Sequence, residues 1–343
     1  MKFLVIGPSW VGDMVMSQSL YKRLLNLYPH AVIDVLAPVW SKPILKRMPE
    51  VNCSIDMPIK HGKFDLVQRW QIGRSLAGKN YTHAIIQPNS AKSALIPLFA
   101  GIKQRTGWKG EMRYGLLNDL RPNQRIFQYM VEQYVALAHK KEAMLHEVSI
   151  INIEAPRLLI DKTTQRITKT RLLLSKEKPV VGLCPGAEFG SSKQWPDQTY
   201  AEVASTLIQR GNQVWMFGSS NDESVCADIF NALPIEQKPY CINLAGKTSL
   251  VEAVDLLAEC HTVISNDSGL MHVAAAVGCN IIAIYGSSSP SYTPPLSNKI
   301  RILSIEMECR PCFKRECPLN HLMCLKKLTP SLVLSAYDSL LLP

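Results

Sequence analysis

The sequence predicts two doubly wound α/β domains in tandem, each built on a parallel sheet. Apolar runs rich in β-branched residues alternate with segments of helical period, and this alternation implies strands joined by crossover helices. The alternation weakens once, in a charged stretch over 161–178, and then starts again. We therefore expect an N-terminal domain over 1–160, a linker over 161–178 and a C-terminal domain over 179–343.

The elements of the N-terminal domain begin with an apolar run over 2–6, which Gly7 and Pro8 end. Apolar residues from Met14 to Tyr28 then recur with helical spacing, which predicts the first crossover helix. Similar patterns predict strands over 31–37 and 82–87, and a short helix between 41 and 48.

The C-terminal domain shows the same alternation more clearly. Gly211 and Gly278 are natural helix stops before the next strand. Ligands of such sheets bind beyond the carboxyl ends of the strands, and two facing domains would form an interdomain cleft. The pattern predicts strands over 180–183, 213–217, 241–244, 262–265 and 280–285, with helices over 197–210, 222–232, 249–259 and 268–277.

The composition is that of a folded globular protein, with 47% apolar and 19% charged residues among 343. No apolar run is long enough for a membrane-spanning helix, and the opening apolar segment is too short for a signal peptide. We expect a cytoplasmic protein, in which the ten cysteines stay reduced.

The formal net charge of +10 is concentrated in one stretch. Residues 60–113 contain ten Lys and Arg residues against two acidic residues, which indicates a large anionic partner. A nucleic acid, a phosphorylated lipid at the inner face of a membrane and a merely solvated face are all compatible with this charge. No nucleic-acid-binding motif accompanies it, so we expect no nucleic acid partner.

The segment Ser265–His272 joins a predicted strand to a predicted helix and is typical of an anion site. Ser268 and Gly269 leave the first helical N–H groups uncovered, and these groups favour a phosphate. Asp267, at the end of the strand, is placed to accept hydrogen bonds from hydroxyls of the same ligand. A sugar nucleotide would satisfy both demands, whereas an ordinary capped helix start is the alternative.

Two further loops contain candidate site residues. The loop after the first strand has one acid, Asp13, and lacks both the dinucleotide and the Walker glycine patterns. Asp13 could take a proton from an acceptor hydroxyl or serve as a helix cap. The loop over 184–196 resembles a diphosphate cradle, with Ser191 and Ser192 as donors and Lys193 as a point charge, although it also suits a simple helix start.

A cysteine-rich segment lies near the C-terminus, over 309–324. Cys309, Cys312, Cys317 and Cys324 have spacings that suit a structural Zn²⁺ site, an iron–sulfur centre or a set of reduced thiols. The last two lack the close pair of a zinc ribbon.

Several stretches together carry a resemblance to one known family. They include Gly7-Pro-Ser-Trp-Val-Gly-Asp-Met14, Glu111-Met-Arg-Tyr-Gly-Leu-Leu-Asn-Asp119, Cys184-Pro-Gly-Ala-Glu-Phe-Gly190 and Asn266-Asp-Ser-Gly-Leu-Met-His272. The chain resembles the ADP-heptose:lipopolysaccharide heptosyltransferases of glycosyltransferase family 9, over nearly its whole length. Within the family it is most similar to the enzymes that act on the first heptose of the inner core.

The resemblance implies a GT-B architecture, two tandem Rossmann-like sheets facing an interdomain cleft, and inversion at the anomeric carbon. It implies a heptose transfer from ADP-L-glycero-D-manno-heptose to lipid A-linked core, by an enzyme bound peripherally to the inner face of the inner membrane. The catalytic base is then Asp13. The donor would be held by residues of two loops, Ser191, Ser192, Lys193, Asp267, Ser268, Gly269, Leu270 and His272.

Within this interpretation, the basic stretch contacts the phosphorylated acceptor, and we expect Lys92, Arg105, Lys109 and Arg113 to do so. The chain contains no Asp-x-Asp pair, which favours metal-independent transfer without a cofactor. Three alternatives stay open at this point. They are another heptosyltransferase step, of type I or III, a noncatalytic sugar-nucleotide-binding protein, and an NAD-dependent oxidoreductase, against which the absent glycine pattern counts.

Overall fold

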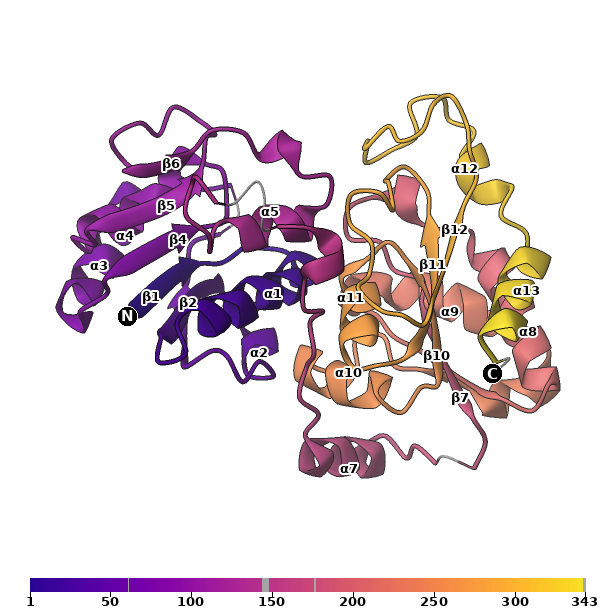
Figure 1. Cartoon of the computed structure of the whole chain (residues 1–343). Helices are drawn as coiled ribbons and strands as arrows, with labels where there is room; N and C mark the ends of the chain where they lie inside the picture. Colours follow the sequence, from indigo (N-terminus) through magenta and orange to yellow (C-terminus); the bar gives the residue numbers. More distant parts are fainter. Residues whose placement is uncertain (61, 144–147, 176, 342–343) are drawn as a thin grey trace. The chain divides into compact units, whose positions relative to one another are not determined.

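The computed structural model describes residues 1–60, 62–143, 148–175 and 177–341. It divides the chain into two compact units, Met1–Pro156 and Arg157–Pro343, each built around its own sheet (Figure 1). No helix in the described part of the chain is long and apolar enough to cross a membrane.

The sheet of the first unit contains six parallel strands among the described residues, in the order β3-β2-β1-β4-β5-β6. The predicted strands and crossover helix near the N-terminus are confirmed. The strands are β1 (Lys2–Ile6), β2 (Val32–Pro38), β3 (Cys53–Met57), β4 (His83–Ile86), β5 (Gln104–Trp108) and β6 (Asp119–Arg121). The helices are α1 (Val11–Leu27), α2 (Lys42–Leu45), α3 (Leu66–Leu76), α4 (Leu95–Phe99) and α5 (Met130–Ala136).

Helices cover both faces of this sheet, as the strand pattern requires. Leu4 and Ile6 of β1 belong to a buried cluster with Leu76 of α3 and Ile96 of α4. Successive side chains of a strand point to opposite faces. Phe3 accordingly lies on the other face, where its ring packs 5.8 Å from that of Tyr28 at the end of α1.

The sheet of the second unit again contains six parallel strands in the described residues, in the order β12-β11-β10-β7-β8-β9. All five strands and all four helices predicted here are found. The strands are β7 (Val180–Cys184), β8 (Gln213–Met216), β9 (Cys241–Asn243), β10 (Thr262–Asn266), β11 (Asn280–Tyr285) and β12 (Ile300–Ser304). The helices are α7 (Lys162–Arg171), α8 (Asp197–Gln209), α9 (Glu223–Asn231), α10 (Leu250–Leu257), α11 (Gly269–Ala276), α12 (Met323–Lys326) and α13 (Pro330–Leu341).

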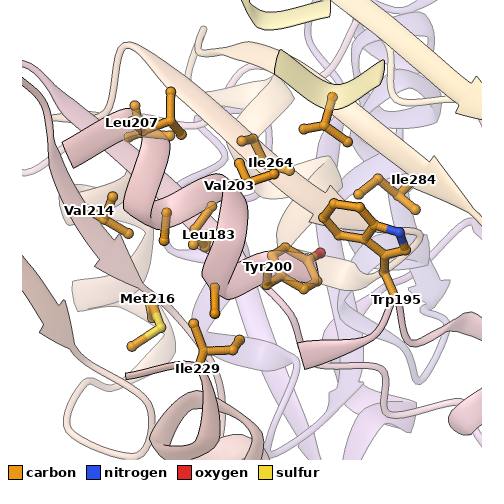
Figure 2. Close-up of a cluster of buried hydrophobic side chains, with 14 of the residues drawn as sticks. Leu183, Trp195, Tyr200, Val203, Leu207, Val214, Met216, Ile229, Ile264 and Ile284 are labelled. Atoms are coloured by element: carbon orange, nitrogen blue, oxygen red, sulfur yellow. The ribbon is translucent and has the colours of Figure 1, made fainter. Parts of the chain in front are cut away.

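The core of the second unit holds the loop after β7 in place (Figure 2). Trp195, at the end of that loop, is fully buried, and its ring meets that of Tyr200 edge-on at 4.9 Å. The Trp195 indole also donates a hydrogen bond to the carbonyl oxygen of Leu328. Burial of two aromatic side chains anchors the loop firmly, because each removes a large apolar area from water.

Both sheets have the same strand order when each is counted from its own first strand. Each runs 3-2-1-4-5-6, so the direction of winding reverses between β1 and β4 in the first unit and between β7 and β10 in the second. Ligands of doubly wound sheets bind at this switch point, beyond the carboxyl ends of the strands. The first turn of α1, which contains Asp13, and the loops that contain Lys193 and Asp267 all follow strands at a switch point.

The stretch over 161–178, expected to be a linker, instead contains helix α7, and this corrects the sequence prediction. Asp161 caps the helix by accepting hydrogen bonds from the N–H groups of Thr163 and Thr164. Arg171 forms an ion pair with Glu252 of α10 at 2.7 Å. The helix is polar and gains its stability from these contacts, which a local pattern cannot reveal.

Candidate functional site

Three loops of the second unit converge on one carboxylate, that of Asp267. This residue follows β10 and is 6% exposed. Its Oδ2 accepts a hydrogen bond from Lys193 Nζ at 2.6 Å and another from Ser288 Oγ at 2.5 Å. Lys193 follows β7 and Ser288 follows β11, and these strands flank β10 in the sheet. The fold thus joins two of the predicted donor-binding residues and adds Ser288, which the sequence analysis did not identify.

Lys193 has a defined position because the turn before it is tightly constrained. Its ammonium also lies 4.9 Å from the ring centre of Phe189. Gly190 has a φ of +149°, and a Cβ there would lie 2.3 Å from the carbonyl oxygen of Arg315. Only glycine fits this position. The turn that follows, Ser191–Lys193, leaves Ser191 exposed and Lys193 partly exposed, so both can meet a ligand.

The start of helix α11 lies directly beside Asp267. Ser268 is the N-cap residue in extended conformation, and its side chain makes no capping hydrogen bond. Ser268, Gly269 and Leu270 are each partly exposed. The N–H groups of a first helical turn have no partner within the helix, and they carry the positive end of the helix dipole. This helix start therefore has the arrangement expected of an anion site.

His272 lies within the helix rather than at its exposed start. His272 is 6% exposed, and burial is the main reason that its pKa is lowered to about 4. The charge of Lys193 also lowers this pKa, and the charge of Asp267 opposes both effects. The imidazole is therefore neutral near pH 7. Its low exposure indicates that it supports the Asp267 region from within the unit.

Ser192 differs from the expectation that its hydroxyl faces a diphosphate. The residue is 1% exposed, and its Oγ lies 2.8 Å from Ser287 Oγ and also donates to the carbonyl oxygen of Lys314. The hydroxyl is used within the fold, so we correct this assignment. The sequence showed only a polar loop, and the partner residues lie about a hundred positions away.

The cysteine-rich segment supports the same loops. Arg310 donates hydrogen bonds to the carbonyl oxygens of Gly286, Ser288 and Ile305. Phe313 N–H donates to Ser287 O. This segment therefore fixes the loop that presents Ser288 to Asp267, a role that no sequence motif indicated.

The four thiols of this segment are not arranged as a metal site. Cys309, Cys312, Cys317 and Cys324 line one small cavity together with His321. In the described part of the chain, no group of three His, Cys, Asp or Glu side chains is positioned to hold a metal ion. Backbone N–H groups, above all that of Leu322, lower the pKa of Cys317, whereas burial raises that of Cys324. The tetrahedral Zn²⁺ arrangement considered from the spacing is absent from this structure.

Asn266 is a second residue that the sequence analysis missed. It is fully buried at the end of β10. Its Oδ1 accepts hydrogen bonds from Trp195 N–H and the Tyr200 hydroxyl, and its Nδ2 donates to the carbonyl oxygen of Pro185 at 2.6 Å. One amide thereby ties the loop after β7 to the end of β10. The adjacent acid signalled a site, but an asparagine alone gives no such signal.

In the first unit, Asp13 lies in the first turn of α1, three positions after the N-cap residue Trp10, and it is partly buried. Trp10 occupies the N-cap position, and Asp13 places its negative charge in the first turn, where the helix dipole favours an acid. The hydroxyl of Ser17 donates to the Asp13 carbonyl oxygen at 2.8 Å and accepts from Gln87 Nε2 at 2.8 Å. This chain of hydrogen bonds connects the first turn of α1 to the end of β4, the other strand at the switch point.

Two of the four expected acceptor contacts are used inside the first unit. Arg113 is 1% exposed, and its guanidinium donates to the carbonyl oxygens of Trp108 and Pro88 and to Asn89 Oδ1. Burial lowers its pKa to about 10, which leaves it charged near pH 7. Arg105 donates to the carbonyl oxygens of three neighbouring loop residues, Ile102, Gly115 and Leu116. We correct the assignment of Arg113, because its buried guanidinium does not present its charge to a partner, whereas Arg105 is partly exposed and its assignment stays a prediction.

The other two expected contacts differ from these. Lys109 is exposed, with its ammonium 6.0 Å from the ring centre of Tyr114. Lys92 is partly exposed and donates to the carbonyl oxygen of Gly62 at 2.8 Å. These two lysines retain accessible charge and stay candidates for an anionic acceptor.

Tandem doubly wound units are the architecture of the GT-B glycosyltransferases, and the fold places the chain in this class. The sequence pattern of glycosyltransferase family 9 (heptosyltransferase) matches residues 69–323. The chain belongs to this family and is a transferase. The alternative of an NAD-dependent oxidoreductase is therefore wrong.

The relatives agree over their full lengths. Lipopolysaccharide heptosyltransferase 2 of Escherichia coli (strain K12) is 48% identical, with 100% of this chain and 99% of that protein covered. Lipooligosaccharide heptosyltransferase 2 of Haemophilus influenzae (strain ATCC 51907 / DSM 11121 / KW20 / Rd) is 49% identical, with 99% of each covered. The solved structure of E. coli ADP-heptose lps heptosyltransferase II has a TM-score of 0.89 at 47% identity, covering 99% of this chain and 98% of that one.

Proposed function

We propose that this chain transfers heptose from ADP-L-glycero-D-manno-heptose to the first heptose of the lipid A-linked inner core. The observation that carries the donor assignment is the convergence of Lys193, Asp267 and Ser288 beside the open start of α11. Full-length identity of 48–49% to proteins named heptosyltransferase 2 supports the particular transfer step. A protein named heptosyltransferase 3 is only 25% identical over 84% of this chain. The comparison therefore favours the step of heptosyltransferase 2 over that of heptosyltransferase 3.

The donor diphosphate would lie at the switch point of the second sheet. Lys193 supplies a positive charge there, Ser191 an exposed hydroxyl, and Ser268 and Gly269 their N–H groups. Before the donor binds, the ion pair with Asp267 holds the Lys193 ammonium in position. When the donor binds, its diphosphate becomes a second anionic partner of the same ammonium. Donors already fixed in place stabilise developing charge without reorganisation, which is usually a large part of catalysis.

In the transfer step, the Asp13 carboxylate takes the proton of an acceptor hydroxyl. The oxygen attacks the anomeric carbon, the bond from that carbon to the phosphate oxygen breaks, and ADP leaves from the opposite face with inversion. Lys92 and Lys109 would contact phosphates of the acceptor, and the lipid anchor of the acceptor requires peripheral contact with the inner membrane from the cytoplasmic side. We propose that transfer is metal-independent and needs no cofactor.

The first test replaces the base. Asp13→Asn should reduce kcat by roughly 10²–10⁴-fold, the range of general base catalysis, with little change in donor KM. Asp197→Asn is the matched control, because Asp197 also lies in the first turn of a helix. Near-normal turnover of Asp13→Asn would refute the base assignment.

The second test identifies the transfer step. Mass analysis after incubation with ADP-heptose and acceptors that contain no, one or two heptoses should show one added heptose on the one-heptose acceptor only. Addition to either other acceptor would assign a different step, and no addition to any of the three would favour a noncatalytic sugar-nucleotide-binding protein.

A further inference from the structure

An exposed apolar face lies on helix α3 of the first unit. We define the α3 apolar face as Phe64, Leu66, Val67 and Trp70, which are 57%, 47%, 66% and 51% exposed. Large apolar side chains that gather on one helix and stay open to solvent indicate an interaction surface, whereas isolated ones need no explanation.

One side of α3 is packed tightly, so the helix has a defined orientation. A Cβ at Gly73 would lie 2.5 Å from Phe99 Cβ of α4, which shows how closely the two helices approach. Arg69, Gly73 and Leu76 are the buried residues of α3. Leu66 lies seven positions before Gly73, at the edge of this packed side, and Trp70 and Val67 follow round the helix toward solvent, where they are 51% and 66% exposed.

The loop that precedes α3 is also held in place. The Arg69 guanidinium, on a residue that is 4% exposed, donates to the carbonyl oxygens of Lys63, Phe64 and Lys92. Asp65 caps the helix by accepting a hydrogen bond from Gln68 N–H. These four side-chain hydrogen bonds hold the loop that carries Phe64 in one position, so the exposed Phe64 ring has a defined place beside α3.

Basic residues border the α3 apolar face. Lys60, Lys63 and Arg74 are all exposed, and the one acid in this segment, Asp65, is used as the helix cap. Aromatic and aliphatic side chains bordered by lysine and arginine match the boundary between lipid headgroups and acyl chains. Clustered basic residues add attraction to anionic lipids.

We propose that the α3 apolar face docks on the surface of an anionic lipid bilayer, with Phe64, Val67 and Trp70 entering the headgroup layer and Lys60, Lys63 and Arg74 contacting lipid phosphates. This inference rests on the proposed function, in which the acceptor is anchored in a membrane. A protein partner would not require the basic border, and the docked side chains would hold the first unit at the bilayer that carries the acceptor.

Cosedimentation with vesicles tests the proposal without the need for catalysis. The full chain should bind vesicles that contain phosphatidylglycerol and bind phosphatidylcholine vesicles much more weakly. The double variant Val67→Ser/Trp70→Ser should bind at least about tenfold more weakly, because two exposed apolar side chains no longer enter the lipid. Lys60→Gln/Lys63→Gln should lose roughly fivefold per residue, and this loss should disappear at high salt.

The control variants separate docking from general stickiness. Ile235→Ser and Leu173→Ser remove apolar side chains that are 84% and 89% exposed on the second unit, and they should leave vesicle binding unchanged. Val67→Ser/Trp70→Ser should keep its unfolding temperature and its activity toward a deacylated, water-soluble acceptor, while losing activity toward acceptor embedded in vesicles.

Three results would overturn the proposal. They are a full chain that does not bind anionic vesicles, a double variant that binds as the Ile235→Ser control does, and a dimer in solution that Val67→Ser/Trp70→Ser disrupts. Normal transfer to the soluble acceptor alongside any of these would leave the proposed function intact. Absence of all transfer with intact vesicle binding would instead contradict the proposed function alone.

Discussion

The replacement of Arg113 by methionine tests the distinction between cations that build the first unit and cations that contact a partner. Arg113 is 1% exposed and serves the carbonyl oxygens of Trp108 and Pro88 and the side chain of Asn89. Arg113→Met keeps much of the side-chain volume and removes every donor. The buried carbonyl oxygen of Trp108 and the partly buried one of Pro88 then lose their partner.

The expected cost follows from these contacts. Each buried acceptor left without a donor costs roughly 1–3 kcal/mol, so the variant should lose about 3–5 kcal/mol of unfolding free energy. For a unit of this size, roughly 2–4 °C of Tm corresponds to each kcal/mol, which gives a fall of about 10 °C. Lys109→Met is the control, because an exposed lysine should change stability by no more than about 0.5 kcal/mol.

Two measurements separate the structural role of Arg113 from an acceptor contact. Calorimetry gives the Tm of each variant, and initial rates at varied acceptor concentration give its acceptor KM. Arg113→Met should lower Tm and reduce activity in proportion to the unfolded fraction, with acceptor KM unchanged at a temperature where the variant is folded. Lys109→Met should keep its Tm and raise acceptor KM. An Arg113→Met protein with normal Tm and a raised acceptor KM would refute the structural role and restore Arg113 as an acceptor contact.

Two further predictions concern the second unit. Burial lowers the pKa of His272 in the folded state to about 4. Between about pH 4 and 6.5 the unfolded state therefore binds more protons than the folded state. The free energy of unfolding should fall by up to about 3 kcal/mol as the pH drops through this range. Denaturant titrations across this range should show a slope that His272→Gln removes, and an equal slope in both proteins would contradict the assignment. A lysine at position 310 cannot donate to the carbonyl oxygens of Gly286, Ser288 and Ile305 together, so Arg310→Lys should loosen the loop that contains Ser288. We expect ADP to bind roughly tenfold more weakly, which is about the free energy of one hydrogen bond between the protein and a charged ligand group. The acceptor KM should not change. Isothermal titration with ADP checks this against the exposed control Arg301→Lys, and equal affinities in the two variants would exclude a positioning role for Arg310.

The sequence pattern missed four strands, three at the edges of the sheets and β5, which lies between β4 and β6. Residues 53–57, 119–121 and 300–304 form β3, β6 and β12, which the apolar pattern did not predict. Each is an outermost strand with partly exposed side chains. An edge strand buries less of each side chain than a central one, so its sequence needs less apolar character and resembles a loop.

The sequence by itself determined the fold class, most of the central strands and the candidate donor and base residues. Buried central strands require apolar runs, and the segments after them contain the acid, the lysine and the helix start to which we assign the proposed chemistry. These are local properties, which a stretch of ten residues can display.

Only the tertiary structure decided which of the polar residues come together and which stay accessible. Strand order places the loops of Lys193, Asp267 and Ser288 together, although they come from distant parts of the chain. Packing buries Ser192 and Arg113 and leaves Lys109 exposed, although all three stand in polar segments. Burial depends on which elements cover a side chain, and that covering is set by contacts between segments far apart in the sequence.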